Sequence, residues 1–174
     1  VTGAQQTALY LSLLQQKNIA IVANQTSVLF KNEGLTLKEE NATHLVDSLH
    51  KLNITIKKVF SPEHGFRGKA DAGEKVDNEI DPSTGLSIVS LYGKSKRKPS
   101  SQLLGEIDVM IFDLQDVGVR FYTYISTMHY IMEACAENGI PLIILDRPNP
   151  NGFYVDGPIL KSKYKSFVGM HSVP

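Results

Sequence analysis

A run of titratable side chains follows an apolar segment about a third of the way along the chain. Residues 57–60 (KKVF) read as the end of a buried strand, and the next eight residues, 61–68, are SPEHGFRG. Within this run Glu63 lies between two phenylalanines, Phe60 and Phe66. A carboxyl held between them would be partly desolvated, which raises its pKa and suits a general acid. The run therefore predicts acid catalysis by Glu63.

The neighbours of Glu63 also allow a structural interpretation. Glu63 could pair with His64 or Arg67 and only organise a turn. His64 could be a base, a partner of the catalytic group or a metal ligand, and a loop histidine bonded to the backbone would look the same. Gly65 and Gly68 allow a tight backbone that a ligand can approach closely, and ordinary turn glycines would also look the same.

A second polar cluster ends the apolar segment 107–114 and contains Asp113, Gln115 and Asp116. Carboxylates at the end of so apolar a strand need partners, because an unpaired buried carboxylate is unfavourable. Arg120 is an obvious partner, which would make a structural ion pair. Alternatively one aspartate is a second catalytic carboxylate and Arg120 binds an anionic substrate group. A Mg²⁺ or Ca²⁺ site on the two aspartates is a further alternative.

Two more polar groups follow apolar segments. In LDRPNPNG (145–152), two X-Pro bonds fix a rigid loop that carries Asp146, Arg147 and Asn149. This loop is either a substrate clamp or a turn that caps itself. Asn24 and Thr26 follow the first apolar run, and the same two interpretations apply to them.

The segments before these clusters alternate between two apolar periodicities. Continuous short apolar runs predict buried strands at 19–24, 54–60, 86–93, 107–114 and 140–146. Helical spacing predicts helices at 7–16, 41–52, 101–104 and 122–138. Such alternation implies right-handed crossovers and a mainly parallel sheet with helices on both faces. The prediction is an α/β, Rossmann-like three-layer fold in a single domain, 1–174.

This fold would bring the polar clusters together. In open parallel sheets the ligand binds beyond the carboxyl ends of the strands. The clusters at 23–27, 61–68, 113–124 and 146–152 each follow a predicted strand. Their convergence at one edge of the sheet is stronger evidence for a site than any one of them alone.

Local signals refine the predicted elements. Asn41 is a candidate N-cap for the second helix, and Asn138–Gly139 is a C-cap signal for the last one. Tyr122 and Tyr124, near the start of that last helix, could offer hydroxyls and flat faces to a sugar or could pack in the core. The stretch GFYVDGPIL (152–160) suggests a short hairpin.

Composition excludes several classes of function. The charged residues balance at 18 Lys+Arg and 18 Asp+Glu, so the basic excess typical of nucleic-acid binders is absent. No apolar run is long enough to span a membrane. The sequence has no glycine fingerprint for dinucleotides, no Walker loop and no G-x-S-x-G elbow, and its one cysteine and five histidines form no zinc motif. We therefore expect neither a cofactor nor a metal.

Five motifs in order, SPEHGFRG, DAGEKVD, TGLSIVSLYG, FDLQDVGVRFYTYISTM and LDRPNPNG, closely resemble the NamZ-type exo-β-N-acetylmuramidases of bacterial peptidoglycan recycling. The likeness runs from VANQTS to SFVGMHSVP. It implies a Rossmann-like N-terminal domain that a C-terminal domain of the same parent protein follows, and this chain matches only the first. It also implies an extracytoplasmic, periplasmic or cell-envelope location and a peptidoglycan-derived glycan as substrate.

The resemblance implies release of terminal N-acetylmuramic acid and transfers the proposed catalytic glutamate to Glu63. Glycoside cleavage normally adds a second carboxylate, and Asp113 or Asp116 could supply it. The 2-acetamido group would also permit a substrate-assisted route. Muramic acid carries a lactyl carboxylate, which Arg67, Arg120 or Arg147 could bind as a fork. Gln115, Tyr122, Asn24, Asp146 and Asn149 complete the predicted substrate-binding set, with His64 beside Glu63. A fragment-binding module and a metal-dependent hydrolase are the competing hypotheses.

Overall fold

The computed structural model describes residues 1–30, 42–68, 78–92 and 97–174. Its main sheet has six strands in the order β5-β6-β4-β1-β7-β8, and only the β5–β6 pair is antiparallel. The strands are β1 (Ile19–Ala23), β4 (Ile56–Ser61), β5 (Glu79–Ile80), β6 (Ser87–Ser90), β7 (Val109–Asp113) and β8 (Leu142–Ile144). The predicted α/β fold with a mainly parallel sheet is confirmed.

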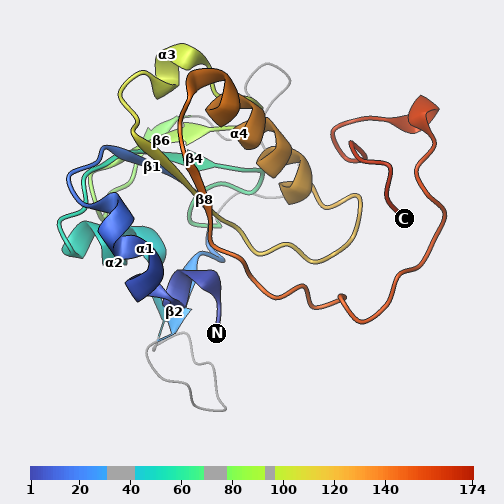
Figure 1. Cartoon of the computed structure of the whole chain (residues 1–174), viewed down its shortest axis with the longest axis horizontal. Helices are drawn as coiled ribbons and strands as arrows, with labels where there is room; N and C mark the ends of the chain where they lie inside the picture. The colour runs from blue at the N-terminus through green and yellow to red at the C-terminus, as the bar shows by residue number, and fades with distance from the viewer. Residues whose placement is uncertain (31–41, 69–77, 93–96) are drawn as a thin grey trace.

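Helices cover both faces of this sheet (Figure 1). They are α1 (Thr7–Leu14), α2 (Leu45–Lys51), α3 (Ser101–Leu104) and α4 (Tyr124–Asn138). Alternate strand residues separate into two buried clusters, because successive side chains of a strand point to opposite faces. One cluster joins the sheet to α1 and α2, and the other joins it to α3 and α4. Every residue of β1 and β7 is buried, which explains their continuous apolar sequence.

The strand order creates a switch point at the centre of the sheet. From β1 the chain moves outward to β4 and β6, and then crosses back to place β7 on the other side of β1. Crevices open at such points beyond the carboxyl ends of the strands. The polar residues that follow β1, β4, β7 and β8 all lie at this edge.

The second helix begins later than its apolar pattern predicts. Residues 42–44 form β3 (Ala42–His44), which pairs with β2 (Val28–Phe30) in a small antiparallel ribbon. The helix α2 starts at Leu45, and His44 is its N-cap, accepting a hydrogen bond from the Val46 N–H. The predicted cap, Asn41, lies outside the described residues.

The end of the chain is an extended arm rather than a hairpin. Residues 148–174 contain one short 3₁₀ turn (Ser162–Tyr164) and an isolated bridge between Ser166 and Gly169, and no strand occurs in 152–160. The predicted hairpin is therefore wrong. By contrast, Gly139 ends α4 in the left-handed conformation, as predicted.

Figure 1 shows the arm leaving the body of the fold after β8. It returns to the start of α4 through a few polar contacts. The guanidinium of Arg120 donates to the carbonyls of Pro158 and Val173, and the Ser126 hydroxyl donates to the Phe167 carbonyl.

None of the helices in residues 1–30, 42–68, 78–92 and 97–174 is long and apolar enough to cross a membrane.

Candidate active site

Side-chain hydrogen bonds connect the ends of the central strands. The Asn24 amide, just after β1, donates to the Tyr124 hydroxyl at the start of α4 over 2.6 Å. The backbone N–H of Gln115, after β7, donates to the Thr26 hydroxyl. The Gln115 side chain then donates to the carbonyl of Pro148, in the loop that follows β8. The predicted convergence of these clusters is therefore observed.

Glu63 joins this edge from the loop after β4. Its Oε2 accepts a hydrogen bond of 3.3 Å from the hydroxyl of Thr123, the residue that precedes α4. Glu63 is half-buried and Thr123 is buried. The positive end of the α4 dipole favours negative charge at this position.

The two phenylalanines do not enclose Glu63 in the way the sequence suggests. Phe60 and Phe66 are both buried, but they belong to the clusters on opposite faces of the sheet. Phe66 packs edge-on against His44, 4.9 Å between ring centroids. They therefore anchor the two ends of the Glu63 loop instead of forming one apolar pocket around its carboxyl.

The loop backbone is strained next to Glu63. His64 has a φ of 74°, a left-handed conformation that non-glycine residues rarely adopt, and Gly65 follows with a φ of 76°. Strain of this kind often occurs at functional sites, where the surrounding structure enforces it. The half-buried His64 lies directly beside the candidate acid.

Arg67 has a structural role. Its guanidinium donates to both oxygens of Asp47 and to both oxygens of Asp81, with the shortest distances at 2.8 Å. Burial of Arg67 opposes its charge, but these two carboxylates raise its pKa overall. Arg67 thus fixes the end of the Glu63 loop to α2 and to the turn at 81–84. With four donated bonds to carboxylates, it is not placed to bind a substrate anion.

Asp113 and Arg147 form a buried ion pair. Arg147 donates to both carboxylate oxygens of Asp113, at 2.6 and 2.9 Å, and the two side chains are 4% and 0% exposed respectively. Burial raises the pKa of Asp113, and Arg147 opposes that rise. The sequence suggested Arg120 as the partner, which is wrong, since Arg120 binds the arm carbonyls instead. The ion pair ties β7 to the loop after β8.

Asp116 differs from Asp113 because part of its carboxylate is unpaired. Oδ2 accepts from the Gly118 N–H at 2.8 Å, whereas the buried Oδ1 has no hydrogen-bond partner in the described part of the chain. A buried acceptor without a partner is unfavourable, so this oxygen is suited to receive a donor from a ligand.

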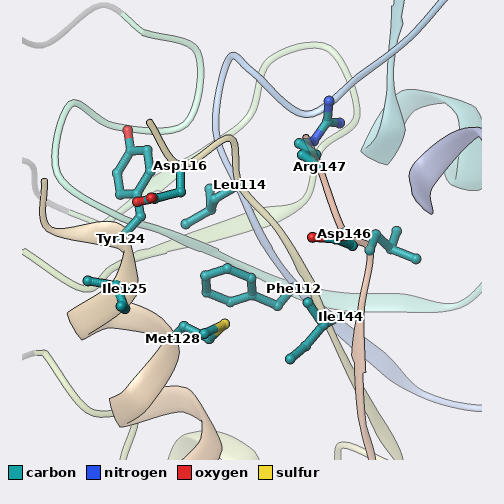
Figure 2. Close-up of a pocket in the computed structure, with 10 residues that line it drawn as sticks. Phe112, Leu114, Asp116, Tyr124, Ile125, Met128, Ile144, Asp146 and Arg147 are labelled. Atoms are coloured by element: carbon teal, nitrogen blue, oxygen red, sulfur yellow. The ribbon is translucent and has the colours of Figure 1, made fainter. Parts of the chain in front are cut away.

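Asp116 borders two cavities. The smaller has a volume of about 190 Å³ and lies between β7, β8 and α4. Figure 2 shows Asp116 beside the ring of Tyr124 at one end, with Phe112, Met128 and Ile144 along the apolar remainder. Burial and the neighbouring Tyr122 raise the pKa of Tyr124, which therefore keeps its proton at neutral pH.

The larger cavity, of about 520 Å³, lies between the loop at 116–121 and the arm. Arg120 lines it, and among the described contacts only its Nη1 donates to protein carbonyls. Two well-exposed aromatic side chains, Phe121 and Tyr154, line it as well. The cavity thus combines a cation, the Asp116 side chain and flat apolar faces, a set that can bind a charged ligand with a ring.

The other predicted binding residues mostly support the loops. Asn24 is fully buried, and its side-chain oxygen accepts from the backbone and hydroxyl of Thr26. The Asn149 side-chain oxygen accepts from the Asn151 N–H. Asn149 also covers Gly118, where a Cβ would lie 2.2 Å from that oxygen. Asp146, which is exposed, lines the smaller cavity, and Tyr122 packs edge-on against Tyr124.

Sequence reasoning did not select Thr123 as a site residue. The only available signal was a threonine at the second position of the predicted helix, 122–138, since a threonine near the start of a helix often indicates an N-cap. In the structure its hydroxyl makes no cap and contacts Glu63 instead.

No cluster of three or more potential metal ligands occurs among residues 1–30, 42–68, 78–92 and 97–174.

Comparison with known proteins adds an independent line of evidence. The family model described as "Exo-beta-N-acetylmuramidase NamZ, N-terminal" matches residues 19–174. A curated relative, peptidoglycan beta-N-acetylmuramidase NamZ of Bacillus subtilis (strain 168), is 46% identical over 167 residues, which cover 95% of this chain and 38% of that protein.

Two crystal structures of DUF1343 family proteins from Bacteroides fragilis NCTC 9343 have the same fold. One superposes with a TM-score of 0.80 at 45% identity, over 100% of this chain and 42% of the other. The second superposes with a TM-score of 0.82 at 37% identity, over 99% and 41%. The chain thus spans 38% to 42% of the length of these relatives. With the family model matching most of its length, this chain belongs to the exo-beta-N-acetylmuramidase NamZ family, of which it represents the N-terminal part.

Proposed function

We propose that this chain carries the acid-catalytic part of an exo-β-N-acetylmuramidase. The reaction is hydrolysis of the glycosidic bond of a terminal N-acetylmuramic acid at the non-reducing end of a peptidoglycan glycan. The observation that carries the proposal is the position of Glu63, held by Thr123 at the edge where the polar ends of β1, β4, β7 and β8 meet. The name of the Bacillus subtilis relative, a peptidoglycan beta-N-acetylmuramidase, agrees with it.

Glu63 is the general acid of the proposed reaction. It protonates the glycosidic oxygen as the bond to the sugar breaks, which lowers the barrier to departure of the leaving group. The hydrogen bond from Thr123 orients that carboxyl, and His64 follows it in a strained backbone conformation.

Asp116 is the second carboxylate that we propose. Asp113 is bonded through both oxygens to Arg147 and is fully buried, whereas Asp116 keeps one oxygen unpaired at the border of both cavities. That oxygen could activate water, or it could orient the N–H of the 2-acetamido group in a substrate-assisted route.

Arg120 is the proposed receptor for the lactyl carboxylate of the sugar. Arg67 and Arg147 already donate to carboxylates of the protein, whereas the hydrogen bonds of Arg120 within the described residues go to backbone carbonyls. Phe121 and Tyr154 would offer their ring faces to the sugar in the same cavity. The rest of the parent protein is a further proposed partner, and a periplasmic or cell-envelope role in cell-wall recycling fits a glycan substrate.

Hydrolysis of a chromogenic β-N-acetylmuramide, measured beside the matching β-N-acetylglucosaminide, tests the proposal. The wild-type chain and Glu63→Gln should be assayed both alone and within the full-length parent protein. We expect release from the muramide alone and a loss of at least about 100-fold in the variant, since general acid catalysis typically contributes 10²–10⁴-fold. Unaltered circular dichroism of Glu63→Gln would exclude misfolding as the cause.

Two outcomes would contradict the proposal. Turnover that survives Glu63→Gln would remove Glu63 from the mechanism. Binding of N-acetylmuramic acid without turnover, in the full-length protein as well, would indicate a binding module instead of an enzyme.

A further inference from the structure

We infer that Thr123 is a positioning residue that determines which oxygen of Glu63 carries the catalytic proton. The inference rests on the proposed function of Glu63 as a general acid. Its basis is the hydrogen bond in which the Thr123 hydroxyl donates to Glu63 Oε2. An oxygen that accepts this bond is the poorer place for a proton, so the protonated acid carries its hydrogen on Oε1.

Thr123 makes this bond instead of the hydrogen bond that an N-cap threonine usually makes. It occupies the N-cap position of α4, where a threonine hydroxyl normally accepts from the backbone N–H groups of the first turn. Here the side chain makes no cap bond. Thr123 is 8% exposed, so water can replace its contact with Glu63 only in part.

The backbone of Thr123 is fixed by its neighbours. Its carbonyl accepts both the backbone N–H and the hydroxyl of Thr127, at 2.9 and 3.2 Å. The next residue, Tyr124, is tied to Asn24 after β1. The donor therefore has a fixed origin relative to the sheet that carries Glu63.

The bond strengthens as the reaction proceeds. When the Oε1 proton moves to the glycosidic oxygen, the C–O bond to the sugar breaks and Glu63 is left as a carboxylate. A hydrogen bond to a charged acceptor is worth more than one to a neutral acid. Thr123 and the N-terminus of α4 therefore stabilise the charge that develops in the transition state, which affects kcat more than KM.

Three variants separate this role from a purely structural one. Thr123→Val keeps the shape and removes the donor, and Thr123→Ser keeps the donor. Thr127→Val makes the same substitution one turn further along without touching Glu63, and it keeps the shorter bond, from the Thr127 backbone N–H to the Thr123 carbonyl. In the full-length protein acting on the chromogenic muramide, we expect Thr123→Val to lower kcat roughly 10- to 100-fold, from the worth of a hydrogen bond to a charged group. KM should change less than about twofold, and the other two variants should keep kcat within roughly threefold of wild type.

A second measurement needs no turnover. The side-chain carboxyl carbon of Glu63 can be observed by ¹³C NMR at one fixed pH, and its signal is identified by its absence in Glu63→Gln. Loss of the hydrogen-bond donor should change the chemical shift of this carbon in Thr123→Val, and the shift should stay close to the wild-type value in Thr123→Ser and Thr127→Val.

The two measurements distinguish the possible failures. A changed chemical shift of the Glu63 carboxyl carbon in Thr123→Val, without any hydrolysis by wild type, would support the Thr123 contact and contradict the proposed function. An unchanged chemical shift in Thr123→Val, or equal kcat losses in Thr123→Val and Thr127→Val, would overturn the inference about Thr123.

Discussion

His44 is a nearly buried side chain whose two ring nitrogens both bond to the backbone. Its Nδ1 accepts from the Val46 N–H at 3.2 Å and its Nε2–H donates to the Asn24 carbonyl at 2.8 Å, so both nitrogens are used by the neutral ring. Burial lowers the pKa of His44, and the nearby Arg67 lowers it further against the opposing carbonyl contact. Protonation would convert the accepting Nδ1 into a donor and break the cap of α2.

This arrangement predicts a pH dependence of stability. Because the folded-state pKa lies below the unfolded value of about 6.5, the unfolded chain takes up a proton first as pH falls. The contribution of His44 to the unfolding free energy is therefore complete above pH 6.5 and decreases below it. Urea unfolding at pH 7.5 and at pH 5.5 measures how much unfolding free energy is lost between the two pH values. This loss should be smaller in His44→Asn than in wild type, because asparagine is a good N-cap that does not titrate. Equal losses in both proteins would contradict the assignment.

Residue types at the site are predictable from the sequence, but their partners are not. Asp113 ends an obvious strand, so its need for a cation follows from the sequence alone. The cation is Arg147 and not Arg120, although Arg120 is nearer in the sequence. The reason is the parallel register of β7 and β8, which aligns Phe112 with Ile144 and so brings the loop after β8 to Asp113. Likewise, Arg67 finds Asp47 and Asp81 only after α2 and the turn at 81–84 are in place.

At the scale of elements, the Asp113–Arg147 pair joins β7 to the end of β8. We expect Arg147→Ala to lower the unfolding free energy by about 3–5 kcal/mol, because removal of one partner leaves a buried charge uncompensated. Denaturant unfolding measures the loss. A double variant, Asp113→Asn with Arg147→Met, should recover part of it, since the pair then leaves no buried charge behind.

The matched control for this pair is at the surface. Lys98 contacts Glu133 and Glu137 of α4 in an exposed position, and Lys98→Ala should leave the midpoint of unfolding nearly unchanged. If Arg147→Ala were equally harmless, the pair would not be the buried connection that the geometry indicates.

The order of strands and helices is predictable because it rests on apolar periodicity, which is a local property. The continuous apolar runs before Asn24 and Leu114 give β1 and β7 within one or two residues. Helix α2 is shorter than its apolar pattern predicts because residues 42–44 pair with β2. Local periodicity does not predict this strand pairing. The arm has no periodicity, and its contacts with the body depend on single groups that no sequence pattern identifies, such as the Val173 and Phe167 carbonyls and the Phe167 ring that stacks on Tyr130.

At the scale of the whole molecule, Arg120 supplies two of the hydrogen bonds that hold the arm to the body, beside the Ser126–Phe167 bond and the stacking of Tyr130 on Phe167. Because Arg120 donates to Pro158 and Val173, its replacement by glutamine should release the arm without unfolding the core. Limited trypsin digestion should then cleave faster at the exposed Lys161, Lys163 and Lys165, while the thermal midpoint remains close to wild type.

A substitution on the opposite face of the sheet serves as the comparison. Lys51→Gln at the end of α2 also removes one cation and should leave the rate of cleavage in the arm unchanged. Equal acceleration in both variants would mean that charge, and not the two Arg120 hydrogen bonds, controls the arm.

The reactivity of the one cysteine of the chain can report how often α4 opens. Cys135 is 2% exposed, and burial raises the pKa of its thiol to about 11, so an alkylating reagent at neutral pH reacts with it essentially only when the helix opens. The rate at which this thiol is alkylated, measured by mass spectrometry, therefore reports the frequency with which α4 opens. The first turn of this helix supports Glu63. The same sulfur would report whether a bound sugar slows those openings, with no probe added to the chain.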